Sequence, residues 1–149
     1  MSDTFCVLPW ISLQLRPDGT VGACPLSQKQ LQEPGGKDAL YMYKHSVADA
    51  LRSPTLAEIR GNLLAGVRDS NCALCWQDED CGRRSKRQID NESYRDLKES
   101  ILNGEVPEQP YFLDISPGNL CNLKCRICSG WNSSKWIEEI EEIYHDDGL

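Results

Sequence analysis

Residues 111–128 have the sequence YFLDISPGNLCNLKCRIC. Its apolar start, residues 111–115, predicts a buried β-strand, and the turn-forming residues 116–119 end that strand. Three cysteines then follow in a C-x3-C-x2-C spacing, namely Cys121, Cys125 and Cys128. Ser133 or Ser134 begins a predicted helix with an apolar face made of Trp136, Ile137, Ile140 and Ile143. The order of strand, cysteine loop and helix indicates the first βα unit of a larger fold.

The composition narrows the class of protein. The chain has 149 residues and a formal net charge of −7, which argues against a nucleic-acid partner because such proteins carry a basic patch. No apolar run is long enough to cross a membrane, and the first residues lack the pattern of a secretory signal. We therefore expect a cytoplasmic protein without membrane contact. In that reducing compartment its eight cysteines indicate metal or redox chemistry, since disulfides are disfavoured there.

The spacing of the three clustered cysteines suits two metals. Three thiolates within eight residues can hold three corners of a [4Fe–4S] cluster and leave one iron open. Zinc is the alternative, although its structural sites usually combine C-x2–4-C pairs into four protein ligands. Soft thiolates bind either metal, so the spacing alone leaves both open, together with a chance arrangement.

Residues 11–24 predict a β-hairpin. Apolar and polar residues alternate from Ile11 to Leu15, and Pro17-Asp18-Gly19 is a turn signal before a short returning strand. Cys6 precedes the hairpin and Cys24 follows it. A hairpin brings its two ends together, so we expect these two thiols to approach one another.

The middle of the chain predicts helices separated by loops. Residues 28–38 are a polar loop, and Ser46 caps a short helix that runs through Leu51. Ser53-Pro54 begins a longer helix with apolar positions at Leu56, Ile59, Leu63 and Leu64, and Gly66 ends it. Residues 72–100 predict one or two exposed helices, and residues 103–110 predict a linker.

Two charged clusters lie on these helices. The basic cluster consists of Arg83, Arg84, Lys86 and Arg87. We expect it to be a solvated helix face, and a contact for an anionic substrate or partner is the alternative. The acidic residues between 138 and 142 are expected on the exposed side of the last helix.

The C-x3-C-x2-C motif directly after a strand resembles the signature of radical S-adenosylmethionine (SAM) enzymes. The resemblance implies that Cys121, Cys125 and Cys128 bind a [4Fe–4S] cluster whose open iron chelates SAM. One electron from that cluster would cleave SAM to methionine and a 5′-deoxyadenosyl radical, which abstracts hydrogen from the substrate. Ile127 replaces a residue that is often aromatic in the family, and we expect it to pack on the adenine. The implied partners are an unknown substrate and an electron donor such as a flavodoxin or ferredoxin.

The remaining cysteines are similar to a second part of that family, the auxiliary-cluster modules called twitch and SPASM. The similarity implies that Cys6, Cys24, Cys72 and Cys75 ligate one auxiliary [4Fe–4S] cluster. Cys81 is then a spare thiol, unless it replaces one of the four. The fourth position of the longer two-cluster run is Ser85 rather than cysteine, so we do not expect a second auxiliary cluster.

These resemblances imply an α+β fold with two parts. Residues 1–104 would be a twitch-like module with a small β-hairpin and helices, and residues 105–149 the first βα unit of an incomplete radical SAM βα barrel. A Gly-Gly-Glu-like segment for the SAM amino group has no counterpart, so we expect the chain to be the front portion of a longer enzyme or a truncated reading frame. We expect no turnover by this chain alone, and 5′-deoxyadenosine formed by the reconstituted, reduced chain would contradict that. The alternatives are a non-enzymatic iron–sulfur electron-transfer module and a zinc-stapled interaction domain.

Overall fold

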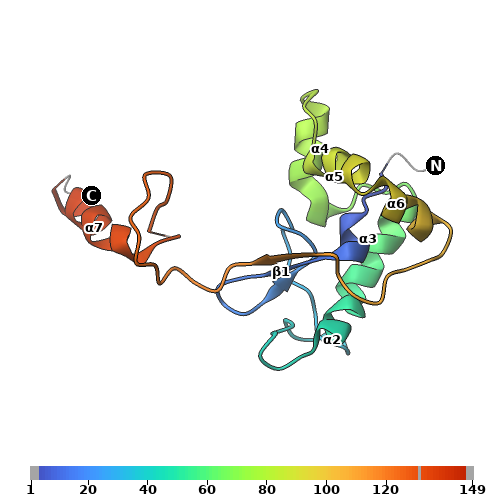
Figure 1. Ribbon diagram of the computed structural model, residues 1–149, viewed down its shortest axis with the longest axis horizontal. Helices are drawn as coiled ribbons and strands as arrows, with labels where there is room; N and C mark the ends of the chain where they lie inside the picture. Colours follow the sequence, from blue (N-terminus) through green and yellow to red (C-terminus); the bar gives the residue numbers. More distant parts are fainter. Residues whose placement is uncertain (1–3, 131, 147–149) are drawn as a thin grey trace. The chain divides into compact units, whose positions relative to one another are not determined.

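The computed structural model describes residues 4–130 and 132–146, with side chains up to residue 142, so the side chain of Ile143 lies outside the described residues. The chain is α+β and divides into two compact units, Met1–Ser116 and Pro117–Leu149. The strand expected to start the second part belongs to the first unit (Figure 1). The expected domain boundary after residue 104 stays a prediction.

A small mixed sheet lies at the centre of the first unit. Strands β1 (Ser12–Leu15) and β2 (Val21–Gly22) are antiparallel, which confirms the predicted hairpin. In the turn between these two strands, Asp18 Oδ1 accepts hydrogen bonds from the backbone N–H and the hydroxyl of Thr20 at 2.9 and 2.7 Å. Gly19 has a φ of 84°, and a Cβ there would lie 3.2 Å from the Tyr43 ring, so this turn requires glycine.

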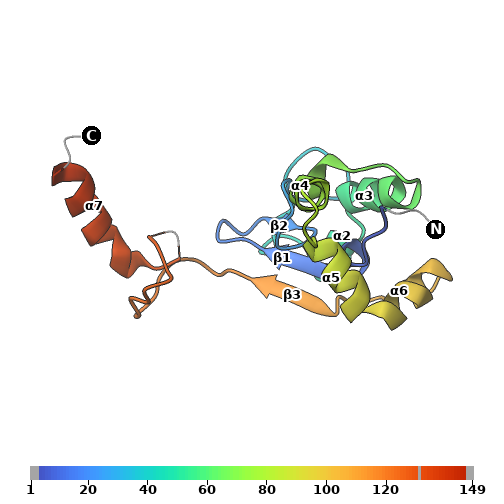
Figure 2. The same ribbon diagram turned by 90° about the horizontal axis from the view of Figure 1, so that it is seen from above.

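Strand β3 (Phe112–Ile115) completes the sheet in the order β2-β1-β3 (Figure 2). It runs parallel to β1, with Ser12 opposite Phe112 and Leu15 opposite Ile115. The prediction that this strand is buried was wrong, because Leu113 and Ile115 are 51% and 57% exposed. β3 lies at the edge of the sheet, and the packing that buries Leu13, the β1 partner of Leu113, does not extend over this strand.

Helices surround the sheet in the first unit. Their bounds are α1 (Leu8–Ile11), α2 (Val47–Leu51), α3 (Pro54–Leu64), η1 (Ser70–Cys72), α4 (Ala73–Asp80), α5 (Lys86–Ser93) and α6 (Arg95–Leu102). The Ser46 cap of α2 is confirmed, and it forms a capping box with Asp49. Residues 72–100 hold α4, α5 and most of α6, more than the one or two helices predicted.

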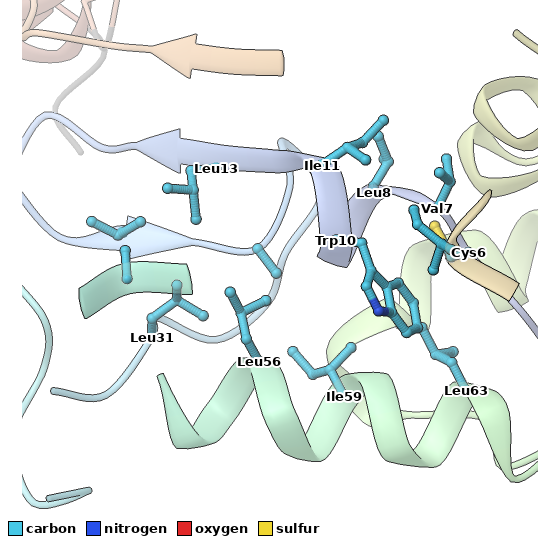
Figure 3. Packing of buried hydrophobic residues seen from close by; sticks show 14 of the residues in the cluster. Cys6, Val7, Leu8, Trp10, Ile11, Leu13, Leu31, Leu56, Ile59 and Leu63 are labelled. Atoms are coloured by element: carbon cyan, nitrogen blue, oxygen red, sulfur yellow. The ribbon is translucent and has the colours of Figure 1, made fainter. Parts of the chain in front are cut away.

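The core of the first unit forms between α3 and the segment that leads into β1. Leu56, Ile59 and Leu63 point from α3 toward Trp10 (Figure 3), and all are at most 4% exposed. Leu64, predicted on the same face, is 53% exposed. Adjacent residues of an α-helix are rotated by about 100°, so Leu64 turns away from the core that its neighbour Leu63 faces. The sulfur of Cys6 lies beside this core (Figure 3).

The second unit contains the cysteine loop, η2 (Ser134–Trp136) and α7 (Ile137–Asp146). Ser133 caps η2 by accepting a hydrogen bond from the Lys135 backbone N–H, as predicted for this helix start. Among the described residues, no helix combines the length and the apolar character that crossing a bilayer requires.

Candidate metal centre

Four cysteines from three segments of the first unit line one hollow. Cys6 precedes α1, Cys24 follows β2, and Cys72 and Cys75 lie at the junction of η1 and α4. The hollow is small, with a cavity volume of about 20 Å³. The predicted approach of Cys6 and Cys24 is therefore confirmed, and the C-x2-C pair meets them. All four are free thiols.

Helix α5 holds the backbone on both sides of Cys6. The Phe5 carbonyl accepts hydrogen bonds from Asn91 Nδ2 and Arg87 Nη1 at 2.7 and 2.9 Å. The Val7 backbone N–H donates to Asn91 Oδ1 at 2.8 Å. Cys6 is thus fixed against a helix that begins 80 residues later in the sequence.

Asn71 joins the segment after Cys24 to the segment of Cys72. This 2% exposed side chain accepts a hydrogen bond from the Lys29 backbone N–H at 2.6 Å, and its Nδ2 donates to Ser27 Oγ at 3.0 Å. Asp69 caps η1 through the Asn71 backbone N–H at 2.8 Å. Two chain segments that carry thiols are therefore held together by buried polar groups that have partners.

Burial dominates the electrostatics of the four thiols. It raises the pKa of Cys6 well above its ordinary value, and the charges of Cys24, Cys72 and Cys75 add to the effect. Burial also raises the pKa of Cys24 and Cys75, and it raises that of Cys72 to about 12. Backbone N–H groups oppose this at three sulfurs: Leu8 at Cys6, Leu26 at Cys24 and Arg87 at Cys75. A metal centre needs thiolates, so these N–H groups favour the form that binds.

Two cations at the start of α5 also line the hollow, Lys86 and Arg87. The Arg87 side chain is 6% exposed, and its Nε and Nη2 donate to the two carboxylate oxygens of Glu79 at 2.9 and 2.6 Å. The prediction of a solvated basic face was therefore wrong for Arg87. Arg83, Arg84 and Lys86 pair with acidic side chains at or near the surface.

Cys81 and Ser85 do not belong to the lining of the hollow. Cys81 is exposed at the end of α4, beyond the turn that carries Cys75. Ser85 is fully buried, where its hydroxyl donates to Glu79 and accepts from the Gln88 backbone N–H at 3.2 Å. Ser85 is thus the N-cap of α5 and forms a capping box with Gln88, a role that was not predicted from the sequence.

Five polar residues hold this hollow or line it: Asn71, Glu79, Lys86, Arg87 and Asn91. The predictions from the sequence missed Asn71, Glu79 and Asn91, and they included Lys86 and Arg87 only as members of the basic cluster. Of these, Lys86 and Arg87 have a local signal, because the capping box places them in the first turn of a helix. The partners of Arg87 on α4 and at Phe5 are set by tertiary packing.

Cys121, Cys125 and Cys128 share one loop in the second unit. The Leu123 backbone N–H donates to Cys121 Sγ at 3.4 Å. The pKa of the Cys128 thiol is raised, mainly by desolvation and to a smaller extent by the neighbouring thiols of Cys125 and Cys121. Cys125 and Cys121 therefore lie close enough to Cys128 to disfavour its thiolate.

Hydrogen bonds close that loop onto itself and onto the following helix. Asn119 Nδ2 donates to the Gly130 carbonyl at 2.9 Å, and Trp136 Nε1 donates to the Cys125 carbonyl at 3.1 Å. The Ile127 side chain is 96% exposed, so its predicted contact with an adenine stays a prediction.

Within the described part of the chain, no group of three or more His, Cys, Asp or Glu side chains is arranged to hold a metal ion. No protein-family model matches the chain, and neither the curated proteins nor the solved structures contain a match.

Proposed function

We propose that the chain is an iron–sulfur protein of radical SAM type. Cys6, Cys24, Cys72 and Cys75 would hold an auxiliary [4Fe–4S] cluster, and Cys121, Cys125 and Cys128 a second one that binds SAM. The single observation that carries the proposal is the hollow lined by four free thiols from segments far apart in the sequence.

The chemistry of the four donors in the hollow supports a cluster, although these side chains as they stand are not arranged to hold a metal ion. Four thiolates are the ligand set of a [4Fe–4S] centre, and backbone N–H groups at its sulfurs are one of the means by which proteins tune it. Here N–H groups reach Cys6, Cys24 and Cys75, and Cys6 and Cys75 are buried. With four thiolates no iron would be left open, so we propose an electron-transfer or structural role for this site.

The loop of the second unit would supply three ligands. A cluster held there would supply the electron that cleaves SAM at its open iron. The chain's own contribution is to fix the backbone of the loop that carries these thiols, through hydrogen bonds from Asn119, Ser133 and Trp136. Exposed Leu120 and Ile127 flank these thiols and offer apolar contact to a ligand.

Anaerobic reconstitution with iron and sulfide tests the proposal. We expect a brown protein that absorbs at about 400 nm. It should hold about eight iron and eight sulfide ions per chain, the content of two [4Fe–4S] clusters. The triple variant C121A/C125A/C128A should hold about half of that iron. C72S should lose the other half, because it removes one of the four proposed ligands. Cys72 is only partly buried, so this substitution should disturb the core less than one at buried Cys6.

C81S is the matched control, because Cys81 directly follows α4, the helix that carries Cys75, but lies outside the hollow. It should bind as much iron as the unaltered chain. Circular dichroism of each metal-free variant shows whether it folds. A colourless protein with bound zinc, or equal iron loss in C81S and C72S, would overturn the assignment. Added SAM should change the electron paramagnetic resonance (EPR) signal of the unaltered chain and leave that of the triple variant unchanged.

A further inference from the structure

The start of α5 places positive charge against the four-thiol hollow. Lys86 and Arg87 both line it, and Arg87 is 5% exposed. The charge of Arg87 acts on Cys72 and Cys75, and that of Lys86 acts on Cys24. The Arg87 backbone N–H also reaches Cys75. One residue thus faces the thiols with its guanidinium and with its main chain.

Acidic groups near the hollow oppose these cations. Asp69 acts on Cys72, and Glu79 and Asp78 act on Cys75. Asp78 is tied to Arg83 at 2.7 Å, and Lys86 to Asp90 at 3.0 Å. The side chain of Lys86 is 30% exposed, so water screens its charge more than that of Arg87. Arg87 and Glu79 form the most buried of the ion pairs near the hollow, so water screens their charges least.

We propose that the Arg87–Glu79 pair sets the reduction potential of the cluster in the four-cysteine hollow, with Arg87 as a positioning residue that favours the reduced state. This inference rests on the proposed function. A cubane with four thiolate ligands is anionic and gains further negative charge on reduction, so a nearby cation raises its potential and a nearby anion lowers it. Arg87 would act in the first sense and Glu79 in the second.

A purely structural role makes a different prediction. Arg87 joins α4, α5 and the Phe5 carbonyl, so removal of either partner of the pair should destabilise the fold. If packing were its entire role, R87Q and E79Q would both lower stability and would not move the potential in opposite directions. The sign of the shift therefore separates electrostatic tuning from structural support.

The experiment is an EPR-monitored redox titration of the full chain carrying C121A/C125A/C128A, so that one cluster is measured. We expect R87Q to lower the midpoint potential, E79Q to raise it, and the double variant R87Q/E79Q to lie between them. R87K should stay closer to the parent than R87Q does, because it keeps the charge. R84Q is the control: Arg84 pairs with Glu92 at the surface and is absent from the lining, so its potential should match the parent.

Opposite shifts in R87Q and E79Q support the inference, and shifts of the same sign or no shift overturn it. Should R87Q fail to fold, E79Q and R87K still decide, because the inference requires E79Q to raise the potential and R87K to stay near the parent. Failure of the proposed function itself has a separate signature, since the parent of the titration would then hold no cluster and would give no redox signal.

Discussion

Ser85 allows a quantitative test of how the first turn of α5 is held. Its hydroxyl caps α5 through the Gln88 backbone N–H and donates to the Glu79 carboxylate, both in a fully buried place. An N-cap contributes about 1 kcal/mol. A hydrogen bond to a charged group contributes about 2 kcal/mol. S85A should therefore lower the free energy of unfolding by about 3 kcal/mol.

Ser46 provides the matched comparison, because it forms the same capping box with Asp49 at an exposed helix start, where its hydroxyl also donates to the Asp49 carboxylate at 2.7 Å. S46A should cost about 1 kcal/mol, because a hydrogen bond to an exposed carboxylate adds little to the cap. The assay is urea unfolding of the metal-free chain under a reductant, followed by circular dichroism. If S85A costs no more than S46A, the buried carboxylate does not depend on the Ser85 hydroxyl, and the account of the α5 start is wrong.

Two further predictions concern the core and the hairpin turn. L63A should destabilise the first unit by about 3 kcal/mol, because Leu63 is fully buried. L64A, at its exposed neighbour, should change stability by less than about 0.5 kcal/mol. Similar losses of stability for the two variants in urea unfolding would refute this packing. Hydrogen bonds from the Thr20 backbone N–H and, to a smaller extent, from its hydroxyl lower the pKa of Asp18 from its ordinary value of 3.8. Ionised Asp18 therefore stabilises the fold above pH 3.8, and this stability is lost as the pH falls toward the lower pKa of the folded state. Melting temperatures between about pH 5 and about pH 3 should therefore fall less in D18N than in the unaltered chain, and equal slopes would contradict the role of Asp18.

Local signals in the sequence predict a good part of the first unit. The alternation before Asp18-Gly19 predicts the hairpin, and the serine at position 46 predicts the start of α2, because both depend on neighbours within a few residues. These two features need no knowledge of the rest of the fold. The approach of Cys6 and Cys24 follows from the hairpin only in part, because contacts of Phe5 and Val7 with α5 also hold Cys6 in place.

Long-range packing decides what the sequence does not predict. The burial of Arg87 depends on Glu79 on another helix and on the Phe5 carbonyl, 82 residues away in the chain. A run of basic residues ordinarily indicates a solvated face, and no local pattern marks which member turns inward. The exposure of Leu113 and Ile115 likewise depends on the place of β3 at a sheet edge, which an apolar run cannot reveal.

The parallel ladder between β1 and β3 has a consequence for the order in which the chain folds. Gln14 Nε2 reaches the Asp114 carboxylate across 100 residues of sequence, so closing this ladder restricts a very long loop. Such pairing forms slowly, whereas the hairpin and the capped helices form from local contacts. During synthesis, one edge of β1 has no β3 to pair with until residue 115 has been added. A nascent chain shorter than this exposes an unpaired strand edge, the kind of surface that promotes aggregation and chaperone binding.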